Sequence, residues 1–118
     1  MKTALLTIVL ITSQIAFGQI KNSANEARHL TLIEDAIQQN CGRMTELTQV
    51  AQKEIKTSID QGITDVTYTT LLTGSQRYDQ VHMNQYEITV ESTKADMYDH
   101  TTKNWGAYGV TSVSCVQK

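Results

Sequence analysis

Two cysteines, Cys41 and Cys115, carry the chemistry that the sequence constrains most. They lack the Cys-x-x-Cys spacing that lowers a thiol pKa for redox exchange. Three interpretations are open: a structural disulfide, two free buried thiols, and a redox pair. Because the amino terminus has the features of an export signal, we expect a Cys41–Cys115 disulfide. It would contribute about 4 kcal/mol to stability by the chain-entropy model.

The three histidines, His29, His82 and His100, show no His-x-His or His-x-x-x-His spacing. The nearest approach to a metal site is Asp96-x-x-Asp99-His100, in a polar stretch. Carboxylates and an imidazole can bind a divalent cation, but a zinc site needs three or four converging ligands. We therefore expect a solvated loop here, with no metal and no cofactor.

General acid–base catalysis has candidate residues but no motif. Glu87 and Glu91 alternate along a predicted strand, and Arg77, His82 or His100 could act beside them. A carboxylate and an imidazole can divide the acid and base roles when a site separates their pKa values. Alternating Glu residues are equally typical of the solvent face of a strand, and serine-nucleophile and phosphate-binding motifs are absent. A hydrolase is therefore an alternative hypothesis.

Trp105, which precedes Gly106 in a polar stretch, is the best candidate for an exposed binding residue. Trp and Tyr bring a large contact area at low entropic cost, so they dominate binding hot spots. Tyr98, Asp99 and His100 lie in the same stretch, and we assign them with Trp105 to a binding surface. The alternative is that Trp105 closes one end of the core.

Residues 1–18 have the three parts of a secretory signal peptide. Lys2 supplies the positive charge, a short apolar run follows, and the small residues Ala16 and Gly18 precede a cleavage site after Gly18. A membrane anchor is the alternative, but the apolar run is too short to span a bilayer. We expect a secreted or periplasmic protein whose mature part, residues 19–118, is one domain.

The charge pattern limits the classes of partner. The formal net charge is −2 at pH 7, and Lys and Arg do not cluster. Binding to nucleic acid or to an anionic membrane surface needs clustered cations. We therefore expect no nucleic-acid partner and no membrane span in the mature chain, which leaves an unknown protein or a small ligand.

The region from Asn22 to Gly62 is predicted to form one long amphipathic helix or two helices in line. Its apolar residues follow one another at intervals of three or four, which is typical of one helix face. These residues are Ala27, Leu30, Ile33, Ile37, Cys41, Met44, Leu47, Ala51, Ile55 and Ile59. Gly42 leaves a helix end or a mild kink open, and we favour two segments that meet near residues 40–43. Gly62 is the predicted stop.

The second half is rich in Thr, Val and Tyr, which is typical of strands. The predicted strands cover 65–72, 78–83, 86–91 and 107–116, with a turn at 73–75 and a long connection over 92–106. A change of apolar parity near Ser112 predicts a bulge, or a strand that is buried on both sides in part. The predicted fold class is α+β: a long or broken N-terminal helix packed on one face of an antiparallel sheet of about four strands.

These features predict a small exported binding or interaction module without enzymatic activity. Its binding surface would be the exposed sheet face and the 92–106 connection. The alternatives are a small secreted hydrolase that uses Glu and His residues of the sheet, and a structural envelope component that self-associates. The hydrolase requires His82 or His100 within hydrogen-bond reach of a carboxylate in a cleft.

Overall fold

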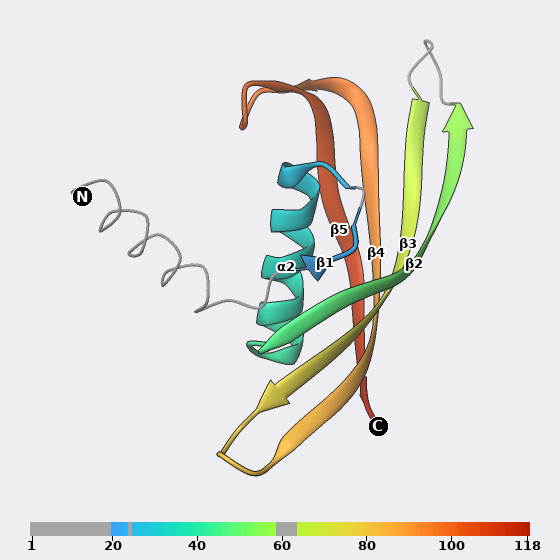
Figure 1. Cartoon of the computed structure of the whole chain (residues 1–118). Helices are drawn as coiled ribbons and strands as arrows, with labels where there is room; N and C mark the ends of the chain where they lie inside the picture. The colour runs from blue at the N-terminus through green and yellow to red at the C-terminus, as the bar shows by residue number, and fades with distance from the viewer. Residues whose placement is uncertain (1–19, 24, 59–63) are drawn as a thin grey trace, which may run out of the picture.

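The computed structural model describes residues 20–23, 25–58 and 64–118. In this part of the chain, five strands form one sheet that curls around a helix (Figure 1). The elements in chain order are β1 (Ile20–Lys21), α2 (Ala27–Cys41), β2 (Glu46–Ser58), β3 (Thr64–Arg77), β4 (Met83–Asp99) and β5 (Asn104–Gln117). The predicted signal peptide, residues 1–18, and the predicted helix stop at Gly62 lie outside the described residues.

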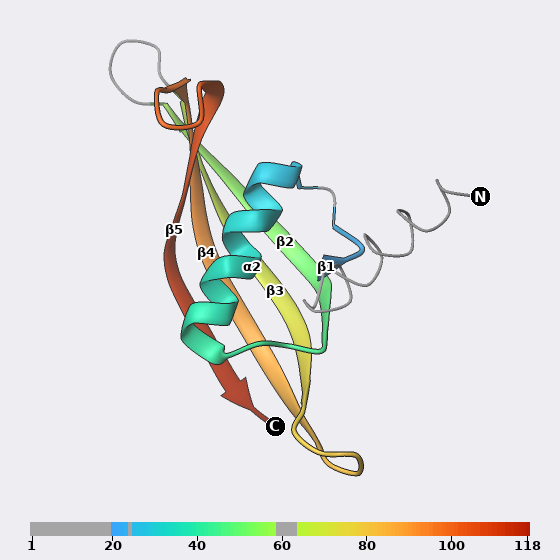
Figure 2. The same ribbon diagram turned by 90° about the vertical axis from the view of Figure 1, so that its left-hand side faces the viewer.

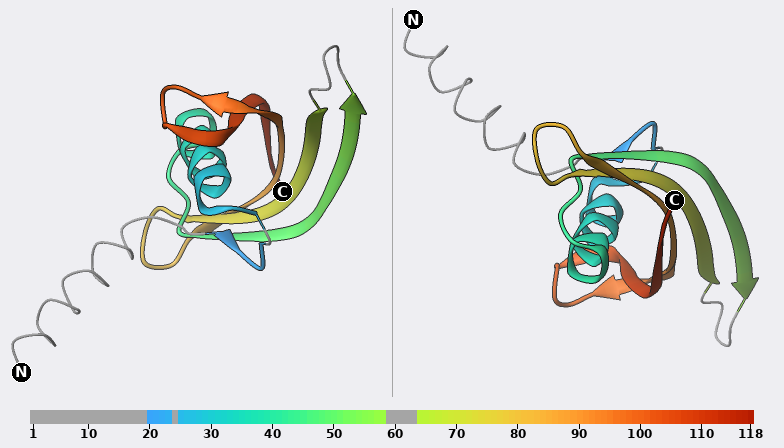
Figure 3. Two further views of the ribbon diagram at one scale, coloured as in Figure 1. Left: turned by 90° about the horizontal axis from the view of Figure 1, so that it is seen from above. Right: turned by 90° about the horizontal axis from the view of Figure 1, so that it is seen from below.

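The sheet has the order β1-β2-β3-β4-β5. The short strand β1 pairs in parallel with β2, through Ile20 with Leu47 and Lys21 with Thr48. The remaining neighbours are antiparallel, so β2 to β5 form a meander. The sheet curls into a half-barrel, and α2 lies on its concave side (Figures 2 and 3).

The predicted α+β fold with a long or broken N-terminal helix on about four strands is wrong. The helix ends at Cys41, because Gly42 takes up a φ of 87° and its N–H donates to the Gln38 carbonyl at 3.1 Å. Of the two alternatives at Gly42, the helix end is therefore the correct one. The chain then leaves helical geometry and enters the sheet.

Residues 46–58, predicted as helix, form β2 and pair antiparallel with β3 from Glu46 to Ser58. The helical spacing of their apolar residues does not mark a buried face. Leu47 is 2% exposed in the core, whereas Ile55 is 50% exposed. Helix propensity is a weak determinant, and here the ladder of hydrogen bonds to β3 overrides it.

Three details of the predicted strand region are also wrong. The predicted turn at 73–75 is part of β3; Gly74 is buried there, and a Cβ at this position would stand 2.9 Å from the Ile88 Cδ1 atom. The predicted strand at 78–83 is mostly the β3–β4 connection, where Asp79 accepts hydrogen bonds from two backbone N–H groups. The predicted connection at 92–106 is largely strand. Gly74, which has no side chain, leaves room for the close approach of the Ile88 side chain and does not form a turn.

The predicted bulge near Ser112 is confirmed. Ser112 pairs with Glu91 and Val110 pairs with Ser92, which leaves Thr111 as the extra residue of β5. One extra residue reverses the parity of the side chains that follow it. Apolar side chains on both sides of the bulge can therefore pack against the core.

The core lies between α2 and the concave side of the sheet. It contains seven buried apolar side chains: Ile33, Ile37, Met44, Leu47, Leu72, Ile88 and Val90. Ile33 and Ile37 come from α2 and the other five from the sheet or its entry, so burial of this helix face holds α2 in the half-barrel.

The predicted Cys41–Cys115 disulfide is confirmed, with a Cα–Cα distance of 6.0 Å. It joins the end of α2 to β5 and indicates that the protein matures in an oxidising compartment. In the ranges that the structure describes, no helix has the length and hydropathy needed to cross a bilayer.

Candidate functional site

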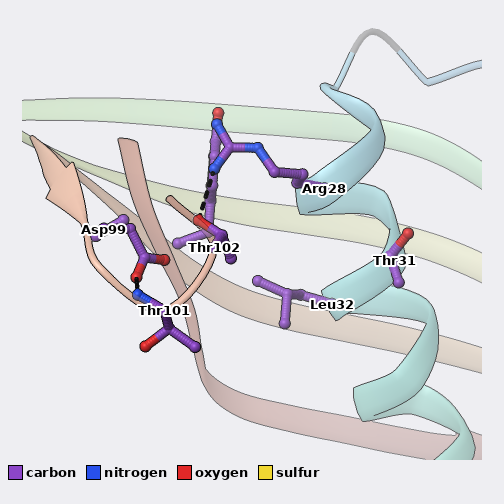
Figure 4. A pocket seen from close by; sticks show the side chains of 8 residues that line it. Arg28, Thr31, Leu32, Asp99, Thr101 and Thr102 are labelled. Carbon is purple, nitrogen blue, oxygen red and sulfur yellow. Dashed lines mark hydrogen bonds between the residues drawn. The ribbon is translucent and has the colours of Figure 1, made fainter. Parts of the chain in front are cut away.

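A cleft of about 630 Å³ lies between the first half of α2 and the end of the β4–β5 hairpin. Figure 1 shows this end of the hairpin bending over the first turns of α2. The lining residues are Arg28, Thr31 and Leu32 from α2, Asp99, Thr101 and Thr102 from the hairpin end, and Ala107 and Tyr108 from β5 (Figure 4). Small-molecule sites have volumes in this range.

Arg28 fastens α2 to the hairpin. Its guanidinium donates hydrogen bonds to the carbonyl oxygens of Trp105, at 2.9 Å, and Gly106, at 3.1 Å. It also donates to the Thr102 hydroxyl at 3.5 Å, as the dashed line in Figure 4 shows. Three contacts with one hairpin end hold that end against α2, so Arg28 maintains the shape of the cleft.

Tyr108 forms one wall of the cleft between two cations. The Arg28 guanidinium carbon lies 5.2 Å and the Lys94 ammonium 5.6 Å from the centroid of its ring. The Tyr108 hydroxyl donates to the Glu26 carboxylate, and this bond is the main cause that lowers the pKa of Glu26. Burial, followed by the bond to Glu26, raises the pKa of Tyr108. Tyr108 therefore stays protonated as a hydrogen-bond donor at neutral pH.

His29 lies behind this wall, inside the core. Its side chain is 2% exposed, and its Nε2 atom is 2.7 Å from the Ser92 hydroxyl. The imidazole lies between two tyrosines, with ring centroids 4.8 Å from Tyr68 and 5.0 Å from Tyr108. A buried imidazole with a hydroxyl partner and aromatic neighbours fits a neutral structural histidine.

Stability is expected to fall as the pH drops through about 6.5, because of His29. Burial lowers the pKa of His29 from its ordinary value of 6.5; Glu26 opposes this effect and Lys94 adds to it. The unfolded chain therefore takes up this proton first. The stability that neutral His29 contributes is fully present above pH 6.5. It is lost as the pH falls toward the lower pKa of His29 in the folded state, at up to about 1.4 kcal/mol per pH unit.

Urea unfolding between pH 7.5 and 5 measures this dependence. His29→Gln keeps a polar partner for Ser92 and should flatten the pH dependence, whereas the exposed control His100→Gln should keep it. If the wild type and His29→Gln lost stability equally over this range, the assignment to His29 would be wrong.

The four residues predicted as a binding surface all lie at the end of the β4–β5 hairpin. Tyr98 pairs with Trp105 across the strands, and the Tyr98 and His100 rings lie 4.9 Å apart. Trp105 is 63% exposed and its indole N–H donates to Asp96, so it does not close the core. Asp99 lines the cleft. The structure thus brings the four together, and their binding role stays a prediction.

The cleft offers both polar and apolar contacts to a ligand. The Asp99 carboxylate accepts a hydrogen bond from the Thr101 N–H at 2.9 Å, and this bond is the main cause that lowers its pKa, so Asp99 is anionic at neutral pH. Figure 4 shows Thr101 and Asp99 on one side and Leu32 opposite them on α2. The arrangement suits a ligand with a cationic or donor group and an apolar part.

The sequence did not reveal the part of the cleft that α2 contributes. Arg28 and Leu32 are four residues apart and therefore share a helix face. That spacing was an available signal, but nothing local shows that the hairpin end covers this face. The contact depends on the curl of the sheet.

No protein-family model, curated protein or solved structure matches this chain significantly. A function for the chain therefore rests on the geometry of its own residues.

The residues proposed for a hydrolase do not converge: Arg77 and His82 lie near Asp79 at the β3–β4 connection, away from the two glutamates. Glu87 and Glu91 are exposed and alternate with the buried Ile88 and Val90 of β4, so they lie on the convex face. The His82 Nδ1 atom is 2.6 Å from the Asp79 carboxylate, but both side chains are exposed, at 62% and 47%. An open hollow of about 460 Å³ beside the pair is lined by Arg77, Tyr78, Asp79 and Gln80, but it does not enclose the exposed His82 and Asp79 side chains.

In residues 20–23, 25–58 and 64–118, no three His, Cys, Asp or Glu side chains are grouped to hold a metal ion. The Asp96–His100 stretch, predicted as a solvated loop, is instead the end of β4 and the start of a turn. Its carboxylates bond to Trp105 and to the Thr101 backbone.

Proposed function

We propose that this protein is a small exported binding module without catalytic activity, and that its ligand binds in the cleft between α2 and the β4–β5 hairpin. The observation that carries the proposal is the cleft of about 630 Å³, which has a carboxylate and hydroxyls on the hairpin side and Leu32 on α2. Its walls are fastened together by Arg28. A largely pre-formed concave site of this size is typical of ligand-binding proteins.

Export to the periplasm or the extracellular space is supported by two features. Residues 1–18 have the sequence plan of a signal peptide. The Cys41–Cys115 disulfide requires an oxidising environment, which both compartments provide.

Recognition would depend on groups that Arg28 leaves available. Arg28 forms an ion pair with Glu26 and donates hydrogen bonds to hairpin carbonyls, so its main role is to hold α2 against the hairpin. The Asp99 carboxylate and the threonine hydroxyls can each form further hydrogen bonds. The expected ligand is a small molecule or a protein side chain with a cationic or donor group.

A screen of small organic cations by two-dimensional NMR tests this function. Bound compounds are expected to shift the amide signals of Thr31, Leu32, Thr101 and Ala107. Thr31→Trp fills the cleft and should lower affinity at least about tenfold, whereas Gln38→Trp, which introduces the same residue on an exposed part of α2 outside the cleft, should not. Shifts scattered over the surface, or equal affinity in the two variants, would contradict the proposal.

A further inference from the structure

The outer edge of β5 lies at the end of the sheet. β5 spans Asn104–Gln117, and among the described residues it pairs with β4 alone (Figure 2). An edge strand presents a row of backbone N–H and C=O groups that match those of another extended chain. This edge is therefore chemically suited to one class of partner, an extended polypeptide.

The pairing with β4 shows which residues direct their backbone groups outward. The Lys118 N–H donates to the Gln85 carbonyl at 2.8 Å, so Gln85 faces β5. In an antiparallel ladder every second residue faces the same neighbour. The β4 residues opposite Val110, Val113 and Cys115 are the ones that face away from β5. These three β5 residues therefore direct their N–H and C=O groups to the open edge.

α2 lies beside this edge. Two hollows lie along the contact between α2 and β5, and we call the region that contains them the α2–β5 seam. The first is the cleft of about 630 Å³ described above. The second, of about 380 Å³, is lined by Leu32, Asp35, Ala36, Gln39 and Asn40 of α2 and by residues 110–113 of β5. Leu32 borders both hollows, so they are neighbours along the seam. Alternate side chains of an added strand, about 6.8 Å apart, would enter hollows arranged in this way.

β5 lacks two of the usual protections of an edge strand. It contains no charged residue and no proline from Asn104 to Gln117. Exposed edges usually carry Lys or Pro to prevent pairing. The bulge at Thr111 bends the strand. The backbone N–H and C=O groups of Val110 and Val113, on either side of the bulge, still point to the open edge.

Asp35 gives the seam an unneutralised negative charge. It lines the second hollow, and its carboxylate forms no hydrogen bond or ion pair in the described part of the chain. A Lys or Arg in the added strand would complement it. Such a pair selects among partners more than it adds affinity.

We propose that the open edge of β5 and the α2–β5 seam bind an extended segment of a partner protein, which adds to the sheet next to β5 and places a Lys or Arg against Asp35. This inference rests on the proposed binding function and names its partner class.

A second copy of the chain fits the seam less well. Its β5 has no cation to place against Asp35. A two-fold pairing of β5 with β5 near residues 110–113 would also bring the Asp35 residues of both copies to one seam. Like charges so placed oppose association. A heterologous segment avoids both problems.

The probe is a set of short linear peptides selected from a randomised display library against the disulfide-bonded protein. Bound peptides are expected to contain Lys or Arg and to slow amide hydrogen exchange at Val110, Val113 and Cys115. N-methylation of every second peptide nitrogen should lower affinity at least about tenfold in one of the two alternating sets and little in the other. Only one edge of an added strand pairs with β5.

Two matched variants test the charge. Asp35→Asn should weaken binding of a Lys-containing peptide by about threefold to tenfold, and a peptide with Gln in place of that Lys should bind both proteins equally. Glu46→Gln, an equal charge change outside the seam, should change affinity less than about twofold.

The outcomes separate this inference from the proposed function. Absence of any peptide binder, equal effects of the two methylation sets, or binding without slowed exchange at β5 would overturn the edge site. If small cations still bound the cleft, the proposed function would survive that result. Slowed exchange at β5 that rises with protein concentration, together with a dimeric mass, would instead identify a second copy as the partner and overturn the heterologous segment.

Discussion

Replacing Cys41 and Cys115 together with alanine is expected to lower the free energy of unfolding by about 4 kcal/mol. The bond connects the end of α2 with β5 across a sequence separation of 74 residues. In its absence the unfolded chain gains conformational freedom that the cross-linked chain lacks. For a domain of this size, the loss corresponds to a melting temperature lower by at least about 15 °C.

Thermal and urea unfolding of the oxidised wild type and the double variant measure this effect. The reduced wild type is the control, because it keeps both cysteine side chains and loses only the cross-link. It should match the double variant within about 1 kcal/mol. Equal melting temperatures of the oxidised wild type and the double variant would show that the bond does not stabilise the fold.

Ile33→Ala is expected to cost about 2–5 kcal/mol of stability. Ile33 is 0% exposed and packs in the core between α2 and the sheet. Truncation removes buried apolar surface and leaves a cavity that the curled sheet can fill only in part. The substitution should therefore weaken the packing of α2 against the concave side of the sheet.

Leu32→Ala is the matched control for this prediction. Leu32 is the preceding residue on the same helix and is 37% exposed, at the border of the cleft. Its truncation should cost less than about 1 kcal/mol in the same urea titration. If the two variants lost equal stability, α2 would not present the Ile33 face to the sheet.

Three strands were predictable because their patterns are local. The predicted strands 65–72, 86–91 and 107–116 lie within β3, β4 and β5, where β-branched and aromatic residues alternate with polar ones. The bulge near Ser112 followed from a change in that alternation. The helix prediction was correct from Ala27 to Cys41, where the apolar spacing of three and four residues matches a buried face.

The second part of the predicted helix failed because residues 46–58 carry an ambiguous pattern. Leu47, Ala51 and Ile55 have helical spacing, yet the segment also contains the β-branched residues Thr48 and Val50. Helix and strand propensities differ by only a small free energy per residue, so local propensity does not decide whether this segment forms a helix or a strand. The pairing partner, β3, lies later in the chain, so only the folded arrangement decides.

The candidate site was predictable only where its residues are neighbours in sequence. Tyr98, Asp99, His100 and Trp105 lie together because a single hairpin end carries them. Arg28 comes from α2 and reaches this end only because the sheet bends over the helix. Such a contact leaves no mark in local composition or spacing.

The sequence by itself determined the features that short segments encode: helix over residues 27–41, the cores of three strands, and the pair of cysteines able to form the disulfide. Only the tertiary structure decided that residues 46–58 become β2, that the sheet curls into a half-barrel, and that Arg28 meets the hairpin. The physical reason is that strand pairing and sheet curvature satisfy backbone hydrogen bonds between distant segments. The free energy of these hydrogen bonds exceeds the local secondary-structure propensity of any single segment.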